Sequence, residues 1–506
     1  MTTIDPPSQV SPAGHRENFE TKAAQIRRRQ QLVRLPASLF VPVIGGMLIL
    51  VADAQALALI PLQASLVTSY GLTASQAGWT LSATAIATAA AVPILTRMGD
   101  RYGLRRMLLV SMGFVTIGQL LCALAEEFPL LVIGRTILGM SAAIAIIYSL
   151  IRDTTRDAHA VNRAMGILTS FTGVGIGASF LAGGTILKLD GTVTTFFWII
   201  TVLGAILWLL SWLFIQDSPI RAKSSVDWVG GLTLAALLVM LVIAIAQGNE
   251  WGWGSSAVIT LLVGAAVAAV FWTAWELRVS APMIDVRILS RRSVWPAALV
   301  MGLASALGVY TSLVVSGYVQ TPSAAGYGMT ASPLMAGVYL LPISLPIAFG
   351  GVLAAPIIRA LGQRACMILA STLIVVDLLW FAFFHSNAIE IVIGTAIFGS
   401  AYALGSTAAI GSTMTTARRG EAGMLSSIAT VGVTVGNAIS PAIFVATLTA
   451  SFAFIPGTEI LVPAEDNYRT ALLYGAALGA VMLIAALVAK SPQFSNELAE
   501  DAELVG

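Results

Sequence analysis

Two charged residues stand inside long apolar stretches of the sequence. Asp53 lies in LVADAQALALIPLQ, and Arg135 lies in LVIGRTILGMSAA. Charge in an apolar surrounding is costly, so each residue should face protein or water and have a partner. If the stretches are helices that run in opposite directions, both residues lie roughly 10 Å from the same side of the membrane. We therefore expect Asp53 and Arg135 to be partners, either as a functional pair or as a purely structural ion pair.

A second group of charges lies in TRMGDRYGLRRM, between two apolar stretches. Gly103 can adopt the backbone angles that such a short turn requires. The group is either a basic anchor on the cytoplasmic side or a gating loop that Asp100 locks by contacting the positive start of the helix near Glu421. The residues of this predicted gating loop are Asp100, Arg101, Gly103, Arg105 and Arg106.

Further residues could line a cavity. Asp377 is another acid deep inside an apolar stretch, and it is either a coupling or substrate residue or a buried structural acid. The polar and aromatic cavity candidates are Tyr310, Ser312, Tyr339, Tyr402, Ser406 and Thr407. The histidines and cysteines show no metal-ligand spacing and no phosphate-binding loop is present, so we expect no metal, no cofactor and no enzymatic activity.

Membrane-spanning helices are the elements that must position these residues. Of the 506 residues, 57% are hydrophobic and 10% are charged, against about 45 to 50% and about 25% in soluble domains. A net charge of +2 offers no surface for nucleic acid. Fourteen stretches reach the length of about 20 residues that a spanning helix needs. They lie near residues 38–60, 78–97, 106–125, 129–150, 164–186, 195–215, 228–247, 256–276, 294–318, 334–355, 366–384, 389–411, 423–447 and 469–489.

The distribution of Lys and Arg predicts the orientation. Outside the apolar stretches they fall on one side of the predicted topology, with Lys188 and Arg469 as exceptions. Because cytoplasmic loops carry the excess of Lys and Arg, we expect both termini in the cytoplasm and a multi-pass protein of the plasma membrane. The first 35 residues hold no signal-peptide pattern, so they are expected to remain as a tail.

An internal repeat divides the chain. VIGRTILG at 132–139 returns as VIGTAIFG at 392–399, about 260 residues later. The chain therefore reads as two six-helix bundles, residues 36–216 and 294–490, related by a pseudo-two-fold axis. Two inserted helices occupy 217–293, and cytoplasmic tails occupy 1–35 and 491–506. Two such bundles with a site between them near the midplane are typical of alternating-access transporters.

These motifs resemble the major facilitator superfamily. TRMGDRYGLRRM is similar to its loop signature between spans two and three, and LVIGRTILGMSAA, with Arg135 and Gly139, is similar to its fourth-span signature. LVADAQALALIPLQ, QGNEWGW, ELRVSAPMIDVRIL and GYVQTPSAAGYGMTASPLMAGVYLLP resemble its fourteen-span drug:proton antiporter family. The resemblance implies the major facilitator fold with fourteen helices, and a role in proton coupling for the first-span acid, Asp53.

The fifth span departs from that family. Its signature is Gly-x3-Gly-Pro-x2-Gly-Gly, whereas this chain reads GIGASFLAGG, with Ser179 and Phe180 in place of Gly-Pro. Small residues allow helices to approach closely. The expected packing glycines of this span are Gly173, Gly175, Gly177, Gly183 and Gly184. The missing proline leaves antiport, exchange and uptake open.

We therefore predict a secondary active exporter of amphiphilic small molecules such as drugs and antibiotics, driven by proton entry through Asp53 with Arg135 as its modulator. Its expected partners are the small-molecule cargo, protons and membrane lipids, and it is expected to be a monomer. A lipid or metabolite carrier on the same fold is one alternative. A membrane sensor that no longer transports is another.

Overall fold

The computed structural model describes residues 37–154, 158–218, 227–279, 282, 286–292, 294–415, 422–456, 458 and 461–489. These ranges are almost entirely helical. Two short strands, β1 (Phe452–Phe454) and β2 (Leu461–Pro463), form an antiparallel pair. The first helices are α2 (Ala37–Leu57), α3 (Leu59–Tyr70), α4 (Ala74–Tyr102), α5 (Leu104–Ala123), α6 (Phe128–Gly139), α7 (Ala143–Thr154), α8 (Ala158–Lys188) and α9 (Val193–Phe214).

The remaining helices fall into two groups along the chain. The middle group is α10 (Trp228–Trp251), α11 (Ser256–Glu276) and the short α12 (Val286–Leu289). The last group is α13 (Trp295–Gln320), the 3-10 turn η1 (Ser323–Ala325), α14 (Pro333–Ala348), α15 (Gly350–Leu361), α16 (Gln363–Phe383), α17 (Ala388–Thr415), α18 (Ala422–Leu448) and α19 (Glu465–Val488).

The helices have the length and composition of membrane spans. Eleven of them in the described ranges pass this test, and up to thirteen do when two bent pairs count as one span each. The pairs are α2 with α3, bent by 46°, and α14 with α15, bent by 58°. Within α18 the described apolar stretch is shorter, Val435–Leu448. The helical membrane fold is confirmed, whereas the number fourteen stays a prediction.

Contacts between helices repeat along the chain. In the first part α2 packs on α8, α4 on α6, and α5 on α6 and α9; in the last part α13 packs on α18, α14 on α17, and α16 on α17 and α19. The glycines of the repeated motif follow the same pattern. A Cβ at Gly139 of α6 would collide with the carbonyl oxygen of Thr84 on α4, and a Cβ at Gly399 of α17 would collide with that of Ile343 on α14. The pattern supports our proposal of two six-helix bundles.

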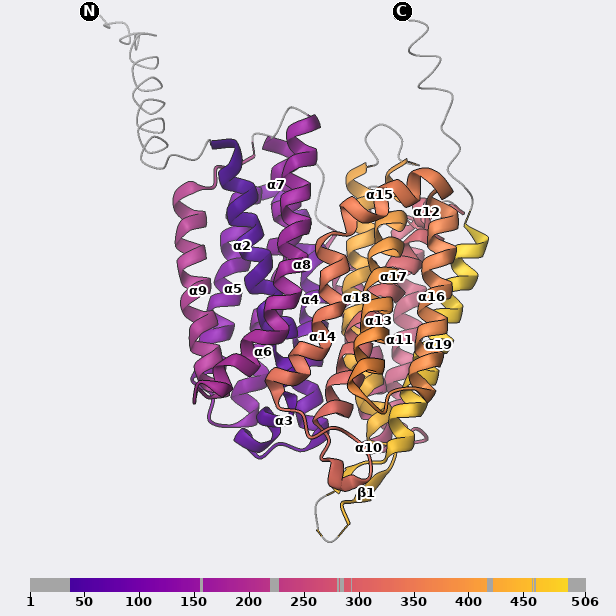
Figure 1. Cartoon of the computed structure of the whole chain (residues 1–506). Coiled ribbons are helices and arrows are strands. Elements are labelled where there is room, and N and C mark those ends of the chain that lie inside the picture. Colours follow the sequence, from indigo (N-terminus) through magenta and orange to yellow (C-terminus); the bar gives the residue numbers. More distant parts are fainter. Residues whose placement is uncertain are drawn as a thin grey trace, which may run out of the picture.

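Figure 1 shows the arrangement of the two groups. The indigo-to-magenta helices α2 to α9 lie on one side and the orange-to-yellow helices on the other, and α2 begins at the same end of the molecule at which α19 ends. The groups meet where α8 packs on α14 and α4 on α18. Helix α10 contacts α11 and also both α4 and α18, so the inserted segment touches each group.

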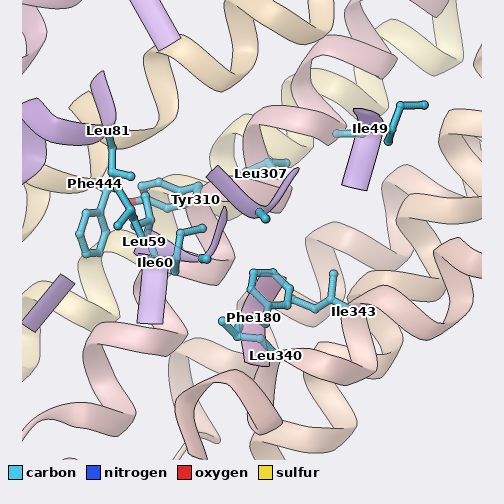
Figure 2. Packing of buried hydrophobic residues seen from close by; sticks show 14 of the residues in the cluster. Ile49, Leu59, Ile60, Leu81, Phe180, Leu307, Tyr310, Leu340, Ile343 and Phe444 are labelled. Atoms are coloured by element: carbon cyan, nitrogen blue, oxygen red, sulfur yellow. The ribbon is translucent and has the colours of Figure 1, made fainter. Parts of the chain in front are cut away.

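The interface between the groups is closely packed. Phe180 of α8 is buried and points toward Leu340 and Ile343 of α14 (Figure 2). A Cβ at Gly337 of α14 would collide with the carbonyl oxygen of Phe180, so the two backbones lie close together. Helix α8 runs without a break from Ala158 to Lys188, with Phe180 where the related signature has proline.

Candidate functional site

A cavity of about 310 Å³ lies where helices of the first group meet α13 and α18. Most of its lining is apolar. Its polar lining residues are Asp53, Gln55, Thr84, Thr88, Arg135, Ser141 and Asn437. An apolar cavity with a few placed polar groups is typical of a site for small molecules.

Asp53 brings an acid into this cavity from α2. Its Oδ2 atom is buried and has no hydrogen-bond partner in the described part of the chain. A Cβ at Gly175 of α8 would lie 2.8 Å from that oxygen, so only a glycine leaves the carboxyl this room. Asp53 also lies within electrostatic reach of Tyr148 and Tyr402. The carboxyl is therefore unengaged, and it can take up a proton or pair with a cargo.

Arg135 lines the same cavity from α6 and is 1% exposed. Its Nε donates to the carbonyl oxygen of Thr80 at 2.7 Å, and its Nη1 donates to that of Gln55 at 2.9 Å. The expected ion pair with Asp53 is not formed between these two described residues, because backbone carbonyls of α4 and α2 bind the guanidinium instead. Arg135 thus fastens α6 to α4 and α2.

Several polar lining residues were not predicted. Gln55 follows Asp53 by two positions, and its Oε1 accepts from Nε2 of buried Gln119 at 3.3 Å. Thr84 and Thr88 are four residues apart and therefore share one face of α4. The four-residue spacing of the threonines, and the position of Gln55 in the same motif as Asp53, could have indicated that these residues line the cavity.

Asn437 is a further lining residue that sequence reasoning missed. It lies on α18 and directly follows Gly436, which the shift of the internal repeat, about 259 residues, pairs with Gly177. Its Oδ1 accepts a hydrogen bond of 2.7 Å from Ser305 of α13. Its position next to a repeated glycine was the available signal.

The predicted cavity candidates of the later helices lie elsewhere, since the lining includes none of them. Tyr310 is 2% exposed, donates to the carbonyl oxygen of Ala471 at 3.0 Å, and packs beside Leu59 and Phe444 (Figure 2). Asp377 is 1% exposed, and neither of its carboxyl oxygens has a hydrogen-bond partner among the described residues.

Most of the other candidates are held by their own helices. Ser312 donates to the carbonyl oxygen of Gly308, and both Ser406 and Thr407 donate to that of Ala403. Tyr339 is half-buried against the core. Tyr402 is also half-buried and is the candidate that lies near Asp53.

The predicted gating loop is the turn between α4 and α5. Gly103 has a φ of 122°, and its N–H donates to Gly99 at 2.9 Å. The backbone N–H of Arg105 donates to Oδ1 of Asp217 at 3.1 Å, and its guanidinium donates to the carbonyl oxygen of Trp212. The turn is thereby tied to the end of α9.

The other charges of the turn differ in exposure. Arg101 and Arg106 are exposed, whereas Asp100 is half-buried. The guanidinium carbon of Arg101 lies 5.4 Å from the centre of the Tyr102 ring. The proposed contact of Asp100 involves Glu421, which lies outside the described residues.

The glycines of α8 mark its contacts on two sides. A Cβ at Gly173 or Gly184 would collide with the backbone of α14, and one at Gly177 would lie 2.7 Å from Oγ of Ser344 on α14. One at Gly183 would lie 2.5 Å from Leu62 of α3. Gly175 lies against Asp53 of α2. These glycines therefore let α8 pack closely between the helices α2 and α3 on one side and α14 on the other.

Comparisons with known proteins agree with this architecture. The sequence profile of the Major Facilitator Superfamily matches residues 43–441. The chain is 26% identical over 393 residues to the multidrug resistance protein Stp of Mycobacterium tuberculosis (strain CDC 1551 / Oshkosh), covering 76% of this chain and 71% of Stp. It is 24% identical over 387 residues to the drug efflux pump JefA of the same strain, covering 75% of this chain and 74% of JefA.

Solved structures with the same fold are more distant in sequence. The POT family transporter PepTSo superposes with a TM-score of 0.63 at 16% identity, covering 92% of this chain and 99% of PepTSo. The human organic anion transporter MFSD10 superposes with a TM-score of 0.59 at 14% identity, covering 89% of this chain and 100% of MFSD10. At such identities the similarity shows the fold alone.

Proposed function

Because the chain belongs to the Major Facilitator Superfamily, a family of membrane transporters and not of enzymes, we propose that it exports amphiphilic small molecules in exchange for protons. The observation that carries this proposal is the unengaged carboxyl of Asp53 in a mostly apolar cavity. The names of Stp and JefA, which describe drug resistance and efflux, support the direction and the class of cargo.

The mechanism is alternating access. The two groups of helices rock about the cavity between them, and the cavity opens to one side of the membrane at a time. Proton and cargo compete for Asp53: cargo arriving from the cytoplasm displaces the proton, and a proton from outside displaces the cargo. Arg135 modulates this exchange through the positive charge that it brings to the same cavity. The two termini lie on the cytoplasmic side in this proposal.

The volume and the lining of the cavity limit the size and polarity of the cargo. A volume of about 310 Å³ with mostly apolar walls suits a compact molecule that is largely apolar. The single carboxyl favours cargo that carries a positive charge or a hydrogen-bond donor. The transporter works as a monomer in the lipid bilayer, since each chain contains its own cavity.

Proton movement in proteoliposomes tests the proposal. Purified protein is reconstituted with an internal pH-sensitive dye and an imposed pH gradient, and then challenged with lipophilic cations and neutral antibiotics. Wild type should release protons down the gradient when cargo is added, and Asp53→Asn should not. Asp466→Asn is the matched control, because Asp466 is an exposed acid in the first turn of α19.

Three outcomes are informative. Loss of coupled proton movement in Asp53→Asn alone supports antiport. Cargo transport that is independent of the proton gradient, and equal in Asp53→Asn, would overturn the coupling. If folded wild type responds to none of the panel, export of amphiphilic drugs is overturned, and the choice lies between a lipid or metabolite carrier and a sensor.

A further inference from the structure

Asn437 is the polar side chain that the last group of helices contributes to the cavity. Of the described lining residues, Val309, Val433, Asn437 and Pro441 come from α13 and α18, and the other three are apolar. The remaining lining residues, including Asp53, come from the first group. The cavity thus has one acid on one side and one carboxamide on the other.

The orientation of this carboxamide follows from its neighbour. Ser305 of α13 is 6% exposed, and its Oγ donates to Oδ1 of Asn437 at 2.7 Å. A carboxamide whose oxygen faces the hydroxyl must turn its NH2 group the other way. Nδ2 has no hydrogen-bond partner in the described part of the chain, and Asn437 lines the cavity, so its two N–H donors are available to a cargo.

Tyr402 extends the polar group that Asn437 and Ser305 form. Tyr402 of α17 lies beside Ser305 and within electrostatic reach of Asp53. Asn437, Ser305 and Tyr402 therefore come from three helices of the last group, and of these three Asn437 lines the cavity together with Asp53. A cargo in the cavity would meet a hydrogen-bond donor on one side and a carboxyl on the other.

We infer that Asn437 recognises an acceptor oxygen of the cargo and that Ser305 positions it. The cargo class is an amphiphile, cationic or neutral, that carries a carbonyl, ester or amide oxygen. The inference rests on the proposed export function and specifies its substrate. Once a cargo fills the cavity, a donor that the cargo leaves unpaired costs free energy, so a cargo that pairs with the donor is favoured over one that cannot.

Two phosphonium ions of equal charge and similar size provide the test. (4-Acetylphenyl)triphenylphosphonium carries a carbonyl oxygen and has no acidic hydrogen beside phosphorus, so it keeps its charge, and tetraphenylphosphonium has no acceptor. Binding of each to the full-length protein in lipid nanodiscs is measured by equilibrium dialysis. Wild type should bind the acetylphenyl compound about fivefold more tightly than tetraphenylphosphonium, as one hydrogen bond between neutral groups predicts. In Asn437→Leu this ratio should fall to about one, while binding of tetraphenylphosphonium stays within about twofold.

Variants at neighbouring positions separate recognition from packing. Val433→Leu, one turn away on α18, alters the lining without changing a donor and should keep the ratio. Ser305→Ala frees the carboxamide to rotate and should lower the ratio, and Ser305→Thr, which keeps the hydroxyl, should restore it. If Ser305 only maintained the packing, Ser305→Ala would weaken the binding of both compounds equally.

The contrary outcomes are distinct. An unchanged ratio in Asn437→Leu, or equal loss of both compounds, would overturn the role of Asn437 and leave the proposed function standing. If folded wild type bound neither phosphonium, the export of lipophilic cations would be overturned together with this inference.

Discussion

The Oδ2 atom of Asp53 lies so close to Gly175 that a Cβ at position 175 would sit 2.8 Å from it. Asp53 is on α2 and Gly175 is on α8, so the acid of the cavity meets the glycine-rich fifth-span motif at this point. The same Cβ would lie 3.2 Å from the Cα of Leu50. The glycine therefore preserves the room that the carboxyl occupies, although Phe180 replaces the proline of the related signature.

Gly175→Ala should reduce cargo-triggered proton movement by about tenfold or more, because a small displacement of a reacting group is costly. The added methyl group must push the carboxyl of Asp53 aside. Proteoliposome assays with the pH-sensitive dye measure the effect. Gly113→Ala is the matched control, since an added Cβ there has nothing within 4 Å. Wild-type proton movement in Gly175→Ala would show that the carboxyl tolerates displacement.

Arg135→Leu should destabilise the protein. It removes the hydrogen bonds that the guanidinium donates to the carbonyl oxygens of Thr80 and Gln55, and each buried hydrogen bond from a charged donor is worth about 1.5 to 3 kcal/mol. Thermal unfolding in detergent, followed by tryptophan fluorescence, should show a lower transition temperature than in Arg106→Leu, which removes an exposed arginine. A transition at the wild-type temperature, together with lost proton coupling, would mean that Arg135 acts in coupling alone.

The sequence predicted the fold well because lipid constrains it strongly. A backbone in hydrocarbon must satisfy its own hydrogen bonds, so long apolar stretches become helices. Breaks within those stretches were not predicted. The stretch at 129–150 divides into α6 and α7, with the N–H of Ser141 donating to the carbonyl oxygen of Gly139 at 2.7 Å. Nothing in the continuous apolar pattern marks this break.

The site was predicted in part. Asp53 and Arg135 stood out because charge is rare in a span, and both line the cavity. The partners of Arg135 are backbone carbonyls, which have no sequence signal. Orientation on a helix was the other obstacle: Val309 lines the cavity, whereas its neighbour Tyr310 packs in the core. Adjacent residues on a helix point about 100° apart, so an error of one residue in the predicted orientation exchanges a cavity-lining residue for a core residue.

Asp377→Leu should stabilise the protein by about 1 to 3 kcal/mol, because it replaces a buried carboxyl without hydrogen-bond partners by an apolar side chain of similar size. Cargo transport should be unchanged, since Asp377 does not line the cavity. Chemical unfolding and the proteoliposome assay measure the two effects, with Asp466→Asn as the exposed control. Loss of coupled proton movement in folded Asp377→Leu would instead assign Asp377 to proton coupling.

The inserted helix α10 bonds to both groups of helices near its end. With its amide oxygen turned toward α4, Gln247 accepts from Nε1 of Trp79 at 2.7 Å. Asn249 donates to the carbonyl oxygen of Ala446 on α18 and, at 3.2 Å, to Oγ1 of Thr449. Helix α10 therefore links α4 and α18, which belong to opposite sides of the cavity.

Asn249→Ala should loosen this link and speed the opening of the helix end beside it. Loss of about 1.4 kcal/mol, a reasonable value for two hydrogen bonds, raises the opening equilibrium about tenfold. Hydrogen–deuterium exchange of residues 446–450 should rise accordingly. Asn387→Ala, which removes the carboxamide that accepts from the N–H of Glu390 at the start of α17, should leave this exchange unchanged. Equal protection of residues 446–450 in Asn249→Ala and wild type would mean that apolar packing alone holds α10 against α18.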